Sequence, residues 1–334
     1  MKRKALRTKN ASSEGVQYES NCEMEIDPGF NNISSNLTSL NNVTLCVDKC
    51  SIVYFDLETS GFQKNANIVQ WRISGSGVRH NILQIAAKSE NTTFNVYVTP
   101  TKPVDVSASK ITGLQNIDGC LFVHGKEVHT LSITEALVSF LQFLISISPH
   151  CLLVAHNARF DSSHLIHAII TTNMVDEFSN VLIGFTDTLN LFKRNLPERK
   201  GRDMFKLESL AQDILQINSE KFHDATYDVE ILNKLVTTLT TKQVLIDNHK
   251  SYIDLARKAI TLPSLRILKN TVSNATIQKL ATSGISYDKL SKVYEEFGHE
   301  GITDLLSKKK LDNKPLITNS KKIIHKIINY FNSK

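Results

Sequence analysis

The chain has 334 residues, of which 41% are hydrophobic and 22% charged, as is usual for a globular protein with one large or two modest domains. It contains no run of 18 apolar residues, so a membrane-spanning helix is not expected. The opening MKRKALRTKN has no apolar stretch behind it, which argues against a secretory signal and favours an intracellular protein of the nucleus or cytoplasm. Five cysteines fit free thiols better than a disulfide framework.

The net charge of +6 is unevenly distributed along the chain. Residues 241–334 carry 17 Lys and Arg against 8 Asp and Glu, a balance of +9, whereas residues 1–240 carry 22 against 25, a balance of −3. A basic C-terminal part favours a polyanionic partner, but a solvated helical surface would give the same count.

Residues 1–50 are rich in Asn and Ser and lack apolar periodicity, which predicts a mostly disordered leader. A strand is then predicted at Ile52-Val53-Tyr54-Phe55, which runs directly into Asp56 and Glu58. Residues two apart on a strand point to the same side, so the two carboxylates repel each other at a buried edge. They form either half of a site for a divalent cation or a strand end with solvated acids.

A repeat follows this strand. Asn67-Ile68-Val69-Gln70 is echoed by Asn81-Ile82-Leu83-Gln84, and removing about 14 residues would leave one plain strand continuing through Ala87. Residues 70–84 therefore look like an insertion, which is either a real basic loop beside the site or an error in the sequence.

The next elements alternate between strands and helices. Strands are predicted at 94–98, 152–155 and 185–189, and helices at 133–146, from about 161 to 170, from 206 and from about 225. The 152–155 run has no polar alternation, which is typical of a central strand buried on both faces. A meander followed by alternating strands and helices predicts an α/β sheet of mixed direction.

Three short motifs occur one after another along this part of the chain. They are DLET at 56–59, HNARFD at 156–161 and HDATYD at 223–228. Together they resemble the three exonuclease motifs of the DnaQ-like (DEDDh) 3′–5′ exonuclease superfamily. The segments 111–114 (ITGL) and 187–189 (DTL) are similar to further family features, and the resemblance extends over residues 51 to about 240. The chain also resembles the exonuclease-like domain of promyelocytic-leukaemia-protein-like chains.

The resemblance implies a fold, an activity and a set of site residues. The fold is α/β, a ribonuclease H-like mixed sheet flanked by helices, in an exonuclease domain over residues 51–240. The activity is metal-dependent 3′–5′ hydrolysis of phosphodiester bonds at the 3′ ends of DNA or RNA, single-stranded in the expected case, with two Mg²⁺ or Mn²⁺ ions as cofactors. The metal ligands fall on Asp56, Glu58, Asp161 and Asp228. The general base falls on His223, and substrate contacts fall on Leu57, Thr59, Asn157 and Phe160.

His223 and Asp228 are five residues apart, about 140° out of alignment on a straight helix, so we expect His223 on the loop before the helix. An unperturbed imidazole, with a pKa near 6.5, suits proton transfer near neutral pH. The neighbouring Asp224 is interpreted as a helix cap rather than a metal ligand. Many relatives pair, so a homodimer is a further expectation.

Beyond residue 240 the pattern becomes helical. Helices are predicted at 285–297, ended by Gly298, at 299–308 and from Ser320, which gives a basic helical domain over residues 241–334. Its lysines could bind a phosphate backbone, or the unit could be a docking module. Two rival functions stay open: a non-catalytic nucleic-acid or protein-interaction module that retains the exonuclease fold, and an endonuclease or small-nucleotide hydrolase.

Overall fold

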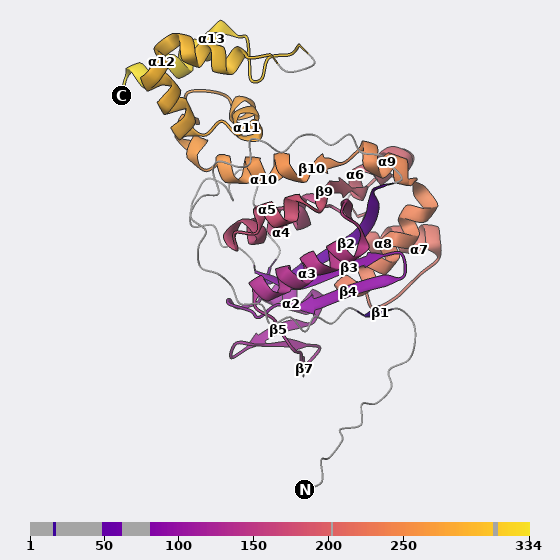
Figure 1. The fold of residues 1–334 in the computed structure, drawn as a ribbon. Coiled ribbons are helices and arrows are strands. Elements are labelled where there is room, and N and C mark those ends of the chain that lie inside the picture. Colours follow the sequence, from indigo (N-terminus) through magenta and orange to yellow (C-terminus); the bar gives the residue numbers. More distant parts are fainter. Residues whose placement is uncertain (1–15, 18–48, 62–80, 202, 310–312) are drawn as a thin grey trace.

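The computed structural model describes residues 16–17, 49–61, 81–201, 203–309 and 313–334 (Figure 1). The leader predicted for residues 1–50 lies outside these ranges except at 16–17 and 49–50, and so does the first copy of the echoed segment. The second copy is described, and it opens a strand at Ile82. None of the helices in the described ranges is both long and apolar enough to cross a membrane.

The described residues form a main sheet with the strand order β1-β4-β3-β2-β8-β9-β10. Its strands are β1 (Val16–Gln17), β2 (Ser51–Thr59), β3 (Ile82–Ser89), β4 (Thr92–Tyr97), β8 (Cys151–Ala155), β9 (Leu182–Asp187) and β10 (Lys250–Ser251). Strands β2, β3 and β4 form an antiparallel meander, whereas β2, β8 and β9 run parallel. The mixed sheet expected from the sequence is therefore confirmed, with β8 buried along its whole length.

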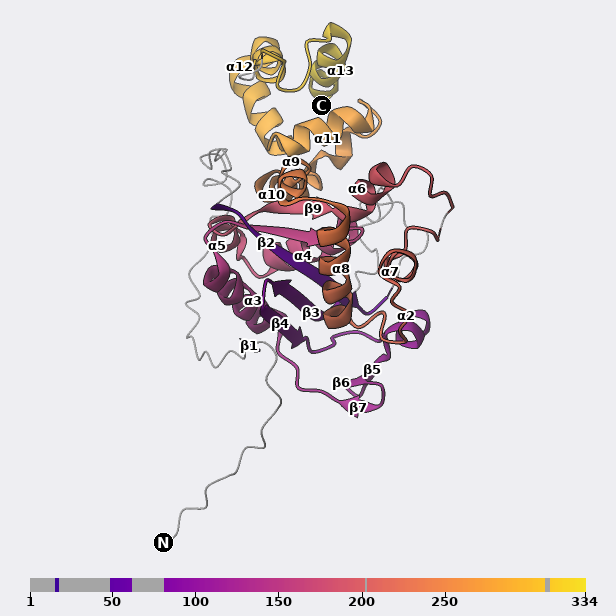
Figure 2. The same ribbon diagram turned by 90° about the vertical axis from the view of Figure 1, so that its right-hand side faces the viewer.

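Helices cover both faces of this sheet (Figure 2). The first layer consists of α3 (Ile133–Ile147), α4 (Arg159–Thr171), α5 (Val175–Ser179) and α10 (Tyr252–Thr261). The second consists of α6 (Thr188–Asn195), α7 (Leu207–Leu215), α8 (Ala225–Leu239) and α9 (Lys242–Asp247). Alternation along β2 explains the two layers: Val53 and Phe55 enter the first core, while Ile52 and Tyr54 pack against the second. The fold is ribonuclease H-like.

A second, small sheet was not predicted from the sequence. It consists of β5 (Leu114–Ile117), β6 (Cys120–Val123) and β7 (Lys126–Glu127), and it follows α2 (Val106–Thr112). In both views it lies at the end of the molecule opposite to the C-terminal helices (Figures 1 and 2).

The C-terminal part is a helical unit with a core of its own. It contains the 3-10 helix η3 (Ser264–Leu268) and the helices α11 (Asn274–Thr282), α12 (Tyr287–Ser307) and α13 (Lys321–Asn332). Gly298 interrupts α12 with φ 57° and ψ −141°, at the position where the sequence predicted one helix to end and another to begin. Phe331 stacks on Tyr287 and Tyr294, which ties α13 back onto α12.

The two cores meet at the end of α10. Tyr252 and Ala256 of this helix belong to the first core of the main sheet, whereas Leu262 begins the core of the helical unit. The domain limits predicted from the sequence remain a prediction, and we propose to shift the inner one from residue 240 to the junction at Leu262.

Candidate metal-binding site

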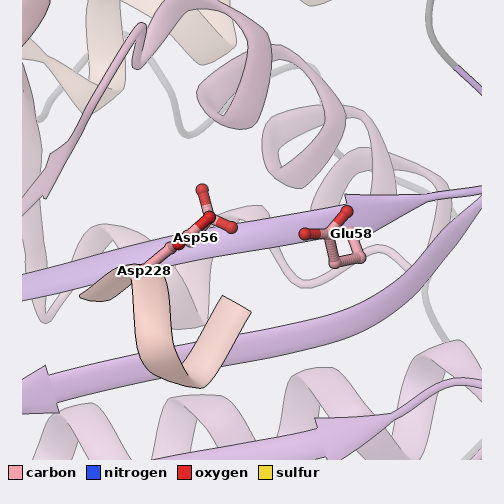
Figure 3. A group of neighbouring side chains, drawn as sticks. All are labelled: Asp56, Glu58 and Asp228. Atoms are coloured by element: carbon pink, nitrogen blue, oxygen red, sulfur yellow. The ribbon is translucent and has the colours of Figure 1, made fainter. Parts of the chain in front are cut away.

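The site is built on the second half of β2. Asp56 and Glu58 extend the face of Tyr54, toward α8, while Leu57 between them enters the core on the opposite face. The first turn of α8 adds Asp228, and one carboxylate oxygen from each of these three acids lies within 4.8 Å of the others (Figure 3). Two elements far apart in sequence thus hold three carboxylates at one point.

Helix α8 begins where it does because Asp224 caps it. The Asp224 carboxylate accepts hydrogen bonds from the main-chain N–H groups of Thr226 and Tyr227, as the interpretation of Asp224 as a cap requires. Ile231 and Leu232 then anchor the helix in the second core. Asp228, one turn into the helix, is therefore carried by a fixed backbone.

The fourth predicted ligand, Asp161, reaches the site from α4. Its Oδ1 accepts a hydrogen bond from the main-chain N–H of Leu57 at 3.2 Å, so it lies beside the strand segment that carries Asp56 and Glu58. Only 3% of Asp161 is exposed. This contact brings a residue of the opposite helical layer beside the three acids. Asp56, Glu58, Asp161 and Asp228 are together called the carboxylate cluster.

The turn before α4 is fixed by Asp187, at the end of β9. Asp187 Oδ1 accepts hydrogen bonds from the main-chain N–H groups of Asn157 (3.0 Å), Ala158 (3.3 Å) and Leu189 (3.1 Å). Asn157 has φ +66°, a left-handed conformation that this carboxylate stabilises. Asp187 therefore links the end of β9 to the turn from which α4 and Asp161 start.

Burial and mutual repulsion both disfavour the charged form of these acids. Burial, reinforced by the charge of Asp224, raises the pKa of Asp56 to about 7. Burial, reinforced by the charge of Asp56, raises the pKa of Asp228 to about 8. The pKa values of Glu58 and Asp161 are raised well above their usual range, again mainly by burial and then by the charge of Asp56. A cation between the carboxylates would reverse these shifts.

One carboxylate oxygen of the site lacks a hydrogen-bond partner in the described part of the chain and is suited to bind a metal ion. Asp228 Oδ1 is buried and has no hydrogen-bond partner among the described residues. Buried carboxylate oxygens are normally paired, and an all-oxygen donor set is the one that Mg²⁺ and Mn²⁺ prefer. The donor atoms of Asp56, Glu58 and Asp228 therefore fit a hard divalent cation.

His223 lies in the turn before α8, as the sequence predicted. Its main-chain N–H donates to Asp228 Oδ2 at 3.2 Å, and its φ of +71° is left-handed, a conformation that costs about 1–3 kcal/mol in a residue with a side chain. Its ring Nε2 lies 2.7 Å from Oε1 of Glu208, on α7. Strain of this kind is concentrated at functional sites.

The predicted substrate residues occupy different environments. The Leu57 side chain is buried in the first core, so only its main chain faces the cluster. Thr59 is also buried, and its hydroxyl donates to the Gly61 carbonyl at 3.0 Å. Asn157 is exposed, and the Phe160 ring packs on that of His164 with centroids 4.4 Å apart. Their roles in binding substrate stay predictions.

Two residues at the site escaped the sequence analysis. Asp187 was noted only as part of a strand end, and two of its three main-chain hydrogen bonds come from a turn 30 and 29 residues away. Glu208 was missed because the helix that carries it is 15 residues from His223, and no spacing rule connects a helix with a later loop. Only the packed structure brings these pairs together.

Comparisons with known proteins give the family. A family model described as "Exonuclease" matches residues 53–236, more than half of the chain, and one described as "PML, C-terminal domain" matches residues 261–334. No curated protein sequence matches the chain.

Three solved structures illustrate the likeness. One shows 3′-end specific recognition of a histone mRNA stem-loop by a 3′-exonuclease: it is 12% identical, covers 60% of this chain and 83% of its own, and has a TM-score of 0.42. A full-length 3′-exonuclease is also 12% identical, with 60% of this chain and 62% of its own covered and a TM-score of 0.41. S. pombe Pop2p in a form with bound Mg²⁺ and Mn²⁺ is 15% identical, with 57% of this chain and 83% of its own covered and a TM-score of 0.39. This chain thus spans less than two thirds of the full-length 3′-exonuclease.

The assignment depends on the family model and agrees with the three motifs. The model spans the strand with Asp56 and Glu58, the turn and helix with Asp161, and the helix with Asp228. The predicted resemblance to DnaQ-like exonucleases is confirmed, and the second model supports the likeness to promyelocytic-leukaemia-protein-like chains. The chain belongs to the exonuclease family.

Proposed function

We propose that this protein is a metal-dependent 3′–5′ exonuclease that hydrolyses phosphodiester bonds at the 3′ ends of single-stranded nucleic acid. The observation that carries the proposal is the convergence of Asp56, Glu58 and Asp228 within 4.8 Å, with Asp161 joined to the same strand segment. The direction of hydrolysis is taken from the superfamily that the motifs resemble. The three motifs do not distinguish the two sugars, so the proposal covers both DNA and RNA.

The four carboxylates would hold two Mg²⁺ or Mn²⁺ ions. When bound, such ions stabilise the attacking and the leaving oxygen of an in-line displacement at phosphorus. Asp56 and Glu58 provide donors from one strand, and Asp161 and Asp228 provide them from two helices on opposite faces of the sheet. The sheet and its two layers of helices keep these donors in place.

His223 is the proposed general base, which removes a proton from the attacking water. Its loop position, beside Asp228 and outside the helix, supports this role, because a loop side chain can approach a substrate that a helix side chain cannot. The main-chain groups of Leu57 and Thr59 and the side chains of Asn157 and Phe160 are the proposed contacts to the terminal nucleotide.

The test is a set of single-stranded DNA and RNA oligomers labelled at either end and incubated with Mg²⁺ or Mn²⁺. The proposal expects mononucleotide release from the 3′ end by the wild type and none by the Asp56→Asn/Glu58→Gln variant. Equal results for wild type and variant would contradict it and favour a non-catalytic module. A circular single strand serves as the control, because its cleavage would indicate an endonuclease.

A further inference from the structure

Glu208 and His223 form a side-chain contact that the proposed mechanism does not use. Glu208 Oε1 and His223 Nε2 are 2.7 Å apart, a short distance for a hydrogen bond between a carboxylate and an imidazole. Both side chains are a little over 40% exposed, so water could form hydrogen bonds with either of them in place of this contact. The contact therefore requires an explanation other than the satisfaction of buried polar groups.

The two partners differ in how firmly their backbones are held. Glu208 lies in the first turn of α7, whose Leu210 and Ala211 are fully buried in the second core against α8. His223 lies in a turn with a left-handed backbone, and its main chain is tied to α8 through Asp228 Oδ2. The main-chain bond fixes where the His223 backbone lies, but it leaves the imidazole free to rotate about χ1 and χ2. The contact to Glu208 removes that freedom.

The contact also determines which ring nitrogen carries the proton. A neutral imidazole has one N–H donor and one acceptor, and the hydrogen bond made by one nitrogen decides the state of the other. A carboxylate can only accept, so the bond to Glu208 places the hydrogen on Nε2. Nδ1 is then left with the lone pair that a proton acceptor needs.

The surroundings of the pair are open. Glu208 and His223 line a cavity of about 380 Å³ together with Ile111 of α2, Gln212 of α7 and Phe222. The pair therefore borders open space that a ligand can enter. Two simpler explanations exist: an acid in the first turn of a helix is favourable by itself, and an exposed ion pair contributes little to stability. Neither explains why the partner is His223.

We propose that Glu208 is a positioning residue for His223: its carboxylate, fixed on α7, holds the rotation and the tautomer of the imidazole. The inference rests on the proposed function, in which His223 acts as the general base. A base on a loop is effective only when its nitrogen stays within hydrogen-bond reach of the proton that it removes, and a small misplacement can cost about 100-fold in rate.

The first test compares three variants at Glu208 with the wild type in the labelled-oligomer assay. Glu208→Ala should lower kcat by roughly 10- to 100-fold and leave KM within about threefold, since Glu208 orients the base without binding substrate. Glu208→Gln should recover most of kcat, because its amide oxygen still accepts from Nε2. Glu208→Asp should behave like Glu208→Ala, since its shorter side chain does not reach the ring.

Asp213 provides the matched control. It lies on the same helix and pairs with Arg199, away from His223, so Asp213→Ala removes a carboxylate and an ion pair from α7 without touching the proposed base. This variant should keep the wild-type kcat. A loss in Asp213→Ala equal to that in Glu208→Ala would mean that damage to α7 explains both.

A double-mutant cycle separates positioning from a general structural role. If Glu208 acts through His223, Glu208→Ala should have no further effect on kcat in a His223→Ala background. An equal fold-loss in both backgrounds would overturn the inference, and so would an unchanged kcat in Glu208→Ala when the wild type is active.

A spectroscopic arm does not depend on activity. Nitrogen-15 NMR of histidine-labelled, metal-free protein should show His223 with its proton on Nε2 in the wild type and a mixture of tautomers in Glu208→Ala. If the wild type releases no nucleotide, the proposed function fails, and this spectrum still decides whether Glu208 fixes the ring. A wild-type His223 with its proton on Nδ1 would overturn the inference.

Discussion

The carboxylate cluster on β2 and the core of the C-terminal helical unit are built from opposite kinds of side chain. The cluster contains the buried Glu58 and Asp161, next to Asp56 and Asp228, whose pKa values are raised. The core between Leu262 and Phe331 is aliphatic and aromatic, and among the described residues of that unit no Asp or Glu is buried. The helical unit thus follows the ordinary rule that a stable interior is apolar, whereas the carboxylate cluster departs from that rule.

A cation bound to the carboxylates would account for this difference. Buried like charges oppose folding, so three carboxylates within 4.8 Å of one another, with Asp161 beside the same strand, are expected where a bound cation offsets their repulsion. The helical unit has no such cluster in its described part, and its stability should come from packing alone. The stability of the exonuclease unit should therefore respond to cations and pH, and that of the helical unit to the loss of buried volume.

The largest expected effect is on activity, at Asp56. Asp56→Asn keeps the shape of the side chain but removes the charge that would hold a divalent ion. Because such an ion supplies several kcal/mol of transition-state stabilisation, the rate of nucleotide release should fall by about 10³-fold or more. The measurement is the initial rate with a 3′-labelled oligomer. Asp254→Asn on α10, which removes a carboxylate paired with Arg257, serves as the control and should retain the wild-type rate.

The same Asp56→Asn substitution should not destabilise the metal-free protein. It removes one of the mutually repelling charges, so the melting temperature without metal should stay equal or rise. A lower melting temperature together with lost activity would indicate that the substitution damages the fold, which would remove the contrast between the two regions.

The next largest effect is on stability, in the helical unit. Ile327 is fully buried in its core, and Ile327→Ala should reduce the free energy of unfolding of that unit by about 2–5 kcal/mol. Hydrogen exchange at the amides of α13 measures the loss, and those of β8 serve as the internal control. Equal acceleration in both elements would show that the two cores unfold as one, contrary to the division at Leu262.

The sequence predicted the parts of the molecule that follow local rules. Alternation and apolar periodicity located β2, β8, α3 and α8, and the motif spacing placed His223 on the loop before α8. The small sheet was missed, although Asp118-Gly119 and His124-Gly125 are two-residue turns with positive φ at both positions. Those two turns were the available signal.

Other features depend on packing between distant segments. The edge strand β10 has only two residues, too few for a periodic pattern, and it joins the sheet through β9. The bond from Leu57 to Asp161 and the contact between Glu208 and His223 connect different elements. A single sequence can predict the residues of such a site, but it does not predict which residues of other elements contact them.

A smaller effect is expected in the pH dependence of the metal-free protein. Asp56 and Asp228, with pKa values of about 7 and about 8 in the fold, have ordinary values near 3.9 when unfolded. The folded state therefore holds their protons more tightly, so this stabilisation is complete below about pH 4 and is lost as the pH rises through 7 and 8. With EDTA present, the melting temperature should fall by more than about 2 °C from pH 5.5 to 8.5.

Mg²⁺ provides the control for this prediction. Cations between the carboxylates lower their pKa values, so saturating Mg²⁺ should raise the melting temperature at pH 8.5 more than at pH 5.5 and flatten the curve. The exchange rates of the α13 amides, corrected for the intrinsic effect of pH, should not change with Mg²⁺. A melting temperature without metal that rises with pH over this range would contradict the assigned pKa directions.

The smallest effect is expected at Asp224, which lies in the same motif as Asp228. Asp224 caps α8 and Asp228 belongs to the carboxylate cluster, so the two should respond differently to the same change from Asp to Asn. Asn caps a helix about as well as Asp, so Asp224→Asn should change the free energy of unfolding by only a few tenths of a kcal/mol and the rate of nucleotide release by less than about threefold. Asp224→Ala should cost about 1 kcal/mol of stability through the lost cap. Asp228→Asn, by contrast, should lower nucleotide release about as strongly as Asp56→Asn. An equal loss in Asp224→Asn would make Asp224 a metal ligand and move the cluster one turn toward the loop that carries His223.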